Sequence, residues 1–200
     1  MLRQTCLALT VALGPVSLGA AAPGGAGAVT PSPPPSPGSA GAVLKNPGGQ
    51  TVGVVQVQDQ GDGRVKISVT AANLPPGFHG IHVHRRGRCD PRSADPATGG
   101  PFFSAGAHLG QGLHPDHAGD LPDLLVGEDG TATASYVTDR FTVDRLVTGN
   151  GTSLVLHAAP DNDANIPDRY RTAGRAGPDA ATLKAGDSGG RIACGVISRR

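Results

Sequence analysis

The chain of 200 residues carries a formal net charge of +1, with 3% aromatic residues, 31 glycines and 18 prolines. This length accommodates one domain with appendages. The near-neutral charge excludes a nucleic-acid partner, which would require a basic stripe, and the glycine and proline content favours turns and short strands over long helices.

Residues 1–22 are typical of a signal peptide. Arg3 supplies a positive charge, an apolar run extends from Cys6 to Leu13, and the small residues Gly19–Ala22 follow. Such a run is too short to span a bilayer, and a lipoprotein cysteine would follow the run, whereas Cys6 precedes most of it. We therefore expect a cleaved signal and a secreted or cell-envelope protein, with an uncleaved N-terminal anchor as the alternative.

Residues 23–49 form a low-complexity segment that includes the proline-rich stretch Pro31–Pro37. Such a segment buries too little apolar surface to offset its ordering entropy. We expect a disordered, partly polyproline spacer here and one folded domain over residues 50–200. The spacer leaves open whether the protein is free or associated with the envelope, and the sequence does not decide between a monomer and a homodimer.

Short alternating stretches rich in valine predict strands throughout residues 50–200. Turn signals at Gln60–Gly63 and Asp129–Gly130 predict two hairpins. Two long loops are expected at 87–121 and 160–190, and their length indicates function. The expected elements are strands over Thr51–Gln58, Arg64–Thr70, Phe78–His84, Leu124–Val126, Thr131–Val137, Ser153–Ala158 and Arg191–Ile197, and a helical turn over Phe141–Val147. This pattern predicts an all-β, immunoglobulin-like Greek-key barrel or sandwich.

Most of the seven histidines fall into two groups. Alternate residues of a strand share a face, so His82 and His84 lie side by side, about 7 Å apart along the chain, and His157 ends a second strand. The other group lies in the first long loop and comprises His108, His114, His117 and Asp120. Three imidazoles and a carboxylate are a complete tetrahedral donor set for zinc. The sequence therefore predicts metal binding.

Two cysteines remain outside the predicted signal peptide, Cys89 and Cys194. An even pair in an exported chain predicts a disulfide. It would close a loop of roughly 100 residues and contribute about 4–5 kcal/mol in the chain-entropy model. Two unpaired thiols are the alternative.

Five segments of the chain together resemble the secreted bacterial copper–zinc superoxide dismutases. They follow the order of that family and extend from about Thr51 to Ile197. The segments are Gly77–His84, Ser104–His108, His117–Pro122, Leu154–His157 with Asp161, and Gly190–Ile197. The resemblance implies the Greek-key barrel of the family, copper and zinc as cofactors, and superoxide as substrate. It also implies conversion of superoxide to dioxygen and hydrogen peroxide by redox cycling of copper, supported by a histidine that bridges copper and zinc.

The resemblance also assigns roles to individual residues. The copper ligands would be His82, His84, His108 and His157. The zinc ligands would be His108, His114, His117 and Asp120, so His108 would be the bridging histidine and take part in catalysis. Arg191 would be the active-site arginine beside copper, with a surface salt bridge as the alternative. Asp161 would join a copper histidine to a zinc histidine, Cys89 would pair with Cys194, and His79 would be a structural residue bonded to the backbone.

The segment between His108 and His114 is shorter than is usual in this family. One hypothesis is a contracted loop that retains zinc, because Gly110 and Gly112 let the backbone fold back. The other is a copper-dominated enzyme with weak or absent zinc. Retention of His114, His117 and Asp120 favours zinc, and His114 is the ligand that the short segment affects most.

Two functions of other classes compete with the enzyme. A copper store or carrier would favour exchangeable sulfur ligands, yet Met1 is the single methionine. A structural extracellular sandwich does not account for the candidate ligands. The complete set of copper-side histidines together with Arg191 favours the enzyme.

Overall fold

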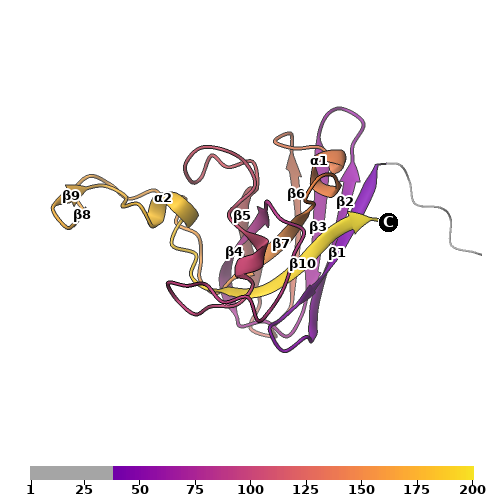
Figure 1. Cartoon of the computed structure of the whole chain (residues 1–200), viewed down its shortest axis with the longest axis horizontal. Coiled ribbons are helices and arrows are strands. Elements are labelled where there is room, and N and C mark those ends of the chain that lie inside the picture. The colour runs from indigo at the N-terminus through magenta and orange to yellow at the C-terminus, as the bar shows by residue number, and fades with distance from the viewer. Residues whose placement is uncertain (1–37) are drawn as a thin grey trace, which may run out of the picture. The chain divides into compact units, whose positions relative to one another are not determined.

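One antiparallel sheet of 8 strands dominates the computed structural model, which describes residues 38–200 (Figure 1). Its strands run in the order β5-β4-β7-β10-β1-β2-β3-β6, and the two edge strands lie against each other, so the sheet forms a nearly closed barrel. The strands are β1 Ser39–Lys45, β2 Thr51–Asp59, β3 Val65–Ala71, β4 Gly77–His84, β5 Asp120–Val126, β6 Ala132–Thr138, β7 Thr152–His157 and β10 Arg191–Arg199. The all-β prediction is confirmed.

Alternating apolar residues explain why these segments form strands. Along β3, Val65, Ile67 and Val69 are buried while the residues between them reach the surface. Period-two burial of this kind places one face of the strand on the core, and each such side chain contributes about 1.5–3 kcal/mol when fully buried. β2 follows a similar rule with Val55 and Val57.

The prediction that the spacer extends to residue 49 is wrong, because the folded domain begins earlier. Strand β1 lies inside the segment assigned to the spacer and pairs with β10 on one side and β2 on the other. Ala40, Ala42 and Leu44 alternate inward and are almost fully buried. Small residues and glycine hid this alternation from the sequence pattern. The predicted signal peptide at 1–22, and spacer residues 23–37, lie outside the described residues.

Two loops carry the remaining elements. The first loop, residues 85–119, holds the 3-10 helix η1 Phe103–Ala105 and ends where β5 begins, earlier than predicted because Pro122 and Asp123 interrupt the apolar pattern. The second loop, residues 158–190, projects from the barrel (Figure 1). Its elements are β8 Arg171–Thr172, β9 Arg175–Ala176 and α2 Thr182–Ala185.

The predicted helical turn is present as α1 Val143–Val147. The Thr142 side chain caps it by accepting a hydrogen bond from the Arg145 amide. Between residues 38 and 200, no helix combines the length and apolar character needed to cross a membrane.

Candidate metal centre

Two neighbouring strands place three histidines at one end of the barrel. β4 and β7 pair so that His82 lies opposite Val155 and His84 opposite Ser153, and His157 is the last residue of β7. The three imidazoles are at most 3% exposed. The prediction that His82 and His84 share a face is therefore confirmed.

Hydrogen bonds to the backbone orient two of these rings. His84 donates from Nδ1 to the carbonyl of Gly106 (2.9 Å), and His157 donates from Nδ1 to the carbonyl of Gly189 (3.1 Å). Their Nε2 atoms then carry lone pairs and face each other at 3.4 Å. Burial, followed by neighbouring histidines, holds the pKa of both rings well below the ordinary value, so no proton relieves the repulsion. A bound cation fits this arrangement.

His82 completes the same arrangement from the other side. Its Nε2 lies 2.7 Å from Asp161 Oδ2, while its buried Nδ1 has no hydrogen-bond partner. Buried polar atoms are rarely left unpaired, so a role as a metal ligand accounts for this nitrogen. The donor atoms of His82, His84, His108 and His157 lie within 4.8 Å of one another.

The first loop supplies a second group around one carboxylate. Asp120 Oδ1 lies 2.7 Å from His108 Nδ1, and Asp120 Oδ2 lies 3.1 Å from His117 Nδ1. His114 Nδ1 is also 3.1 Å from Asp120 Oδ2, but it is buried and lacks hydrogen-bond geometry. The donor atoms of these four residues lie within 4.8 Å of one another, and His108 belongs to both groups.

The charge balance of the second group also fits a cation. Burial disfavours imidazolium at His114, but the contacts with the carboxylates of Asp120 and Asp161 outweigh it and raise its pKa to about 9. Burial opposes ionisation of Asp120, yet the histidines hold its pKa far below the usual value. Nitrogen and oxygen donors of this kind suit zinc.

One carboxylate links the two groups. Asp161 contacts His82 Nε2 through Oδ2 and His114 Nε2 through Oδ1, both at 2.7 Å. The amide of Asp161 donates to both carboxylate oxygens of Asp123, at 3.1 and 3.2 Å. Sequence reasoning missed Asp123, because a single carboxylate three residues after Asp120 carries no motif of its own. Asp161, itself held by Asp123, thereby fixes the orientation of the His82 and His114 imidazoles.

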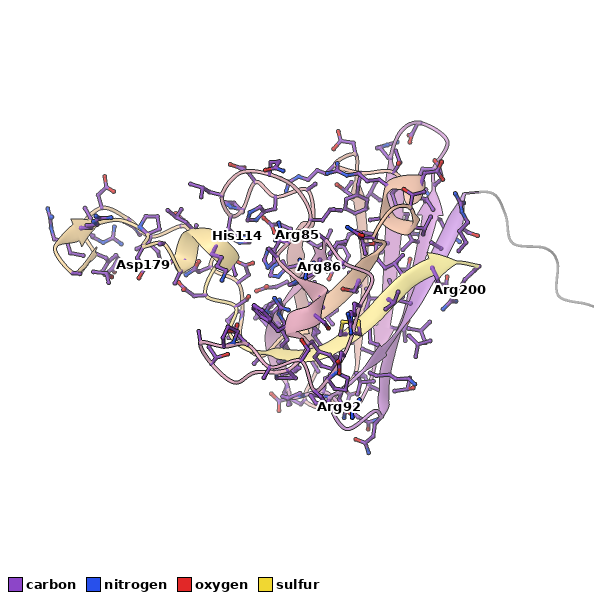
Figure 2. All side chains as sticks on the ribbon, in the orientation of Figure 1. Arg85, Arg86, Arg92, His114, Asp179 and Arg200 are labelled. Carbon is purple, nitrogen blue, oxygen red and sulfur yellow. A yellow bond between two sulfur atoms is a disulfide. The ribbon has the colours of Figure 1, made fainter. Side chains whose placement is uncertain are left out.

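The shortened loop folds back at Gly110, one of the two glycines expected to permit the reversal. Gly110 has φ +117, and a Cβ there would lie 2.5 Å from the Ala118 amide nitrogen, so a side chain is excluded. The returning chain donates from the His114 amide to the carbonyl of Leu183 in α2 (2.9 Å), and Figure 2 shows His114 next to that helix. The contraction thus still brings all four candidate zinc ligands together.

Arg191 is held beside the first histidine group. Its Nη1 and Nη2 donate to the carbonyls of Phe102 and Gly106, both at 2.6 Å. The half-buried guanidinium lines a hollow of about 380 Å³ together with His108 and His157. Desolvation lowers its pKa from the ordinary value, and the group stays charged at neutral pH. This position differs from the surface salt bridge considered as the alternative.

The predicted disulfide joins Cys89 of the first loop to Cys194 of β10. Phe102, Ala105 and Val155 pack in the same cluster. Since Phe102 also accepts a hydrogen bond from Arg191, the disulfide helps to hold the loop over β10.

His79 does not join either histidine group. Its two ring nitrogens lie 2.8 Å from the carbonyl oxygen of His157 and 2.9 Å from that of Pro75. The prediction of a structural residue bonded to the backbone agrees with these contacts.

The barrel and its two adjoining donor groups define a metalloprotein with a centre for two metal ions. The family model for copper/zinc superoxide dismutase (SODC) matches residues 51–197, and the chain belongs to this family. It is a superoxide dismutase that uses copper and zinc and acts on superoxide.

Relatives and solved structures agree with this placement. The chain is 43% identical over 187 residues to the Cu-Zn superoxide dismutase of Mycolicibacterium paratuberculosis, covering 90% of this chain and 82% of that protein. It is 43% identical over 172 residues to the Mycobacterium tuberculosis Cu-Zn superoxide dismutase, covering 81% and 72%. The Cu/Zn superoxide dismutase structure from Brucella abortus aligns with TM-score 0.60 and 27% identity, over 79% of this chain and 98% of that chain.

Proposed function

We propose that this superoxide dismutase is exported and that His108 bridges its two metals. In this proposal the copper ligands are His82, His84, His108 and His157. The zinc ligands are His108, His114, His117 and Asp120. Copper must be stable in two oxidation states and suits imidazole ligands, whereas zinc accepts the mixed nitrogen and oxygen set.

The membership of His108 in both donor groups carries the proposal. Its ring centroid lies 4.1 Å from that of His82, and its Nδ1 lies 2.7 Å from Asp120 Oδ1. Because Nδ1 faces the zinc group, Nε2 is the nitrogen left for the copper group. The ring is 5% exposed, so water does not compete freely for either nitrogen.

Bound copper supplies one-electron chemistry, by which one superoxide is oxidised to dioxygen and a second, with two protons, is reduced to hydrogen peroxide. His108 can deliver one of these protons from Nε2, because Nδ1 remains on the zinc side and keeps the ring in place. Asp161 holds the rings of His82 and His114 from behind, so the two donor groups keep their spacing while the proton moves.

Arg191 attracts and orients the anionic substrate. Two carbonyl acceptors fix its guanidinium at the hollow, where a planar cation suits a small anion. We expect Arg191→Ala to lower kcat/KM about tenfold and to weaken its dependence on ionic strength, because the fixed charge steers the substrate. Steady-state dismutation assays over a salt series measure both effects. Arg92→Ala removes the same charge outside the hollow and should change neither quantity.

Export is supported by the disulfide and by the N-terminal sequence pattern. Disulfides persist mainly in oxidising compartments outside the cytoplasm. We expect mature protein in the envelope or culture fluid with an N-terminus near residue 23, which fractionation and N-terminal sequencing would establish. Full-length protein confined to the cytoplasm would contradict export.

Metal analysis paired with a dismutation assay tests the site. After copper and zinc loading, we expect one equivalent of each metal and high activity. No copper and no activity would contradict the copper assignment. Copper with full activity but no zinc would contradict the zinc assignment and favour the copper-dominated alternative.

A further inference from the structure

The ligand loop, residues 108–120, reaches the barrel at its open seam. β5 and β6 are the two edges of the sheet, so no backbone ladder joins them. The ligand loop ends at Asp120, the first residue of β5, and Arg140 is the second residue after the end of β6. A hollow of about 590 Å³ between the two strands is lined by Pro115, Asp120 and Arg140 among others. Contacts across this seam must therefore come from side chains.

Arg140 spans the seam with one guanidinium nitrogen. Its Nη1 donates to the carbonyl oxygen of Pro115 at 3.2 Å and to that of His117 at 3.0 Å. These two carbonyls lie in the turn between His114 and His117. One side chain from the barrel thus holds both ends of the short segment that presents two candidate zinc ligands.

The backbone around Arg140 is well anchored. Its amide donates to Thr138 Oγ1 at 3.2 Å, and Thr138 pairs with Val65 at the end of β6. The next residue, Phe141, is 3% exposed and belongs to the core. Thr142 then caps α1. The guanidinium therefore extends from a fixed point of the scaffold.

The turn that Arg140 contacts is also hydrogen-bonded to the candidate zinc ligand Asp120. The carbonyl of His117 also accepts from the Asp120 amide at 3.2 Å, and the His117 amide donates to Asp120 Oδ2 at 3.0 Å. Arg140 completes this turn from the outside.

We propose that Arg140 is a positioning residue for the zinc ligands, holding the turn from Pro115 to His117 against the barrel. The proposal rests on the zinc-ligand assignment given above. The Arg140 side chain has two opposite effects on zinc affinity, and the sign of the change in affinity on its removal shows which effect dominates. A cation near a divalent ion disfavours binding, but exposed charge is screened. Loss of a partner that orients metal ligands weakens binding about 10–100-fold.

Arg140→Met tests the proposal because methionine keeps an unbranched stem and removes both charge and donors. We expect zinc affinity, measured by competition with a chromophoric chelator, to fall at least about tenfold. The visible spectrum of cobalt bound in place of zinc should also lose intensity or shift. Copper affinity and the melting temperature of the metal-free protein should change little. Arg140→Lys should recover part of the affinity, since an ammonium can donate to both carbonyls.

Arg92→Met is the matched control, because it removes the same charge from an exposed residue in the disulfide-bonded loop (Figure 2). It should leave zinc affinity unchanged. Unchanged or tighter zinc binding in Arg140→Met would overturn the proposal, as would an equal loss of copper affinity and thermal stability. A wild-type chain that takes up no zinc would refute the ligand assignment and the role of Arg140 with it.

Discussion

The two donor groups are built on different kinds of scaffold. The proposed copper group takes His82, His84 and His157 from β4 and β7, which pair directly in the sheet. The proposed zinc group takes its ligands from a loop and from the first residue of β5. Strand pairing fixes the first group through many shared hydrogen bonds, whereas the second depends on a few side-chain contacts. We expect the zinc group to be the more easily disturbed.

The same residue type responds oppositely in the two groups. His84 and His157 face apolar core and other imidazoles, so their pKa values are lowered. His114 is also buried, but two carboxylates contact it and its pKa rises to about 9. At His114 two carboxylates outweigh burial, whereas at His108 the single carboxylate of Asp120 does not, and burial lowers the pKa of His108 to about 4.

The largest expected effect concerns the disulfide that joins the first loop to the barrel. Replacing Cys89 and Cys194 together by serine should lower the free energy of unfolding by about 4–5 kcal/mol, because the bond closes a long loop in the unfolded chain. Urea unfolding of the metal-free protein measures this change. A loss below about 1 kcal/mol would show that the loop is held mainly by its other contacts.

Removal of a candidate copper ligand that lies on a strand should impair the copper group and leave zinc binding intact. His157→Ala should lower dismutation more than about a hundredfold, beyond the usual effect of residues behind metal ligands, while zinc uptake persists. Copper and zinc analysis with an activity assay tests this. His79→Gln is the matched control and should keep copper, with a loss of about 1–3 kcal/mol in stability from unpaired backbone carbonyls. Loss of zinc in His157→Ala would contradict independent groups.

The stability of the metal-free protein should depend on pH in a way that reflects both the lowered and the raised histidine pKa values. Lowered pKa values, including His108 at about 4, mean that stability falls as pH drops below the ordinary value of 6.5. The raised pKa of His114 means that its contribution is complete below 6.5 and is lost as pH rises toward 9. Stability should therefore peak near pH 6.5 and fall on both sides, more steeply on the acidic side, where His84, His108 and His157 all contribute. Thermal melts across pH measure the curve.

A substitution at His114 separates the two limbs of that curve. His114→Asn should remove the loss at high pH and leave the loss at low pH, since the copper-side histidines are unchanged. A curve that keeps both limbs would contradict the assignment of the raised pKa to this residue.

The smallest expected effect comes from a loop ligand. His117→Ala should weaken zinc binding but lower the dismutation activity of the copper-loaded protein only about tenfold, because residues outside the copper group act on it indirectly. Metal analysis and activity assays decide this. Loss of copper together with zinc would show that the loop also supports the strand histidines.

Much of the fold could be predicted because strand periodicity is local. Alternation identified most strands, and the spacing of His82 and His84 placed both on one face. β1 was missed because alanine and glycine show little contrast along a strand, and its burial depends on β10 at the far end of the chain. The role of Asp123 could not be predicted for the same reason, since its partner Asp161 lies 38 residues away.

The sequence by itself determined the donor types, their order along the chain and the cysteine pair. Only the tertiary structure decided that the short ligand loop brings His114 and His117 to one carboxylate. It does so because Gly110 permits the reversal, and Leu183 and Arg140 anchor the returning chain from elements distant in sequence. Residue identity sets which metals can be held, whereas long-range contacts set whether the donors meet.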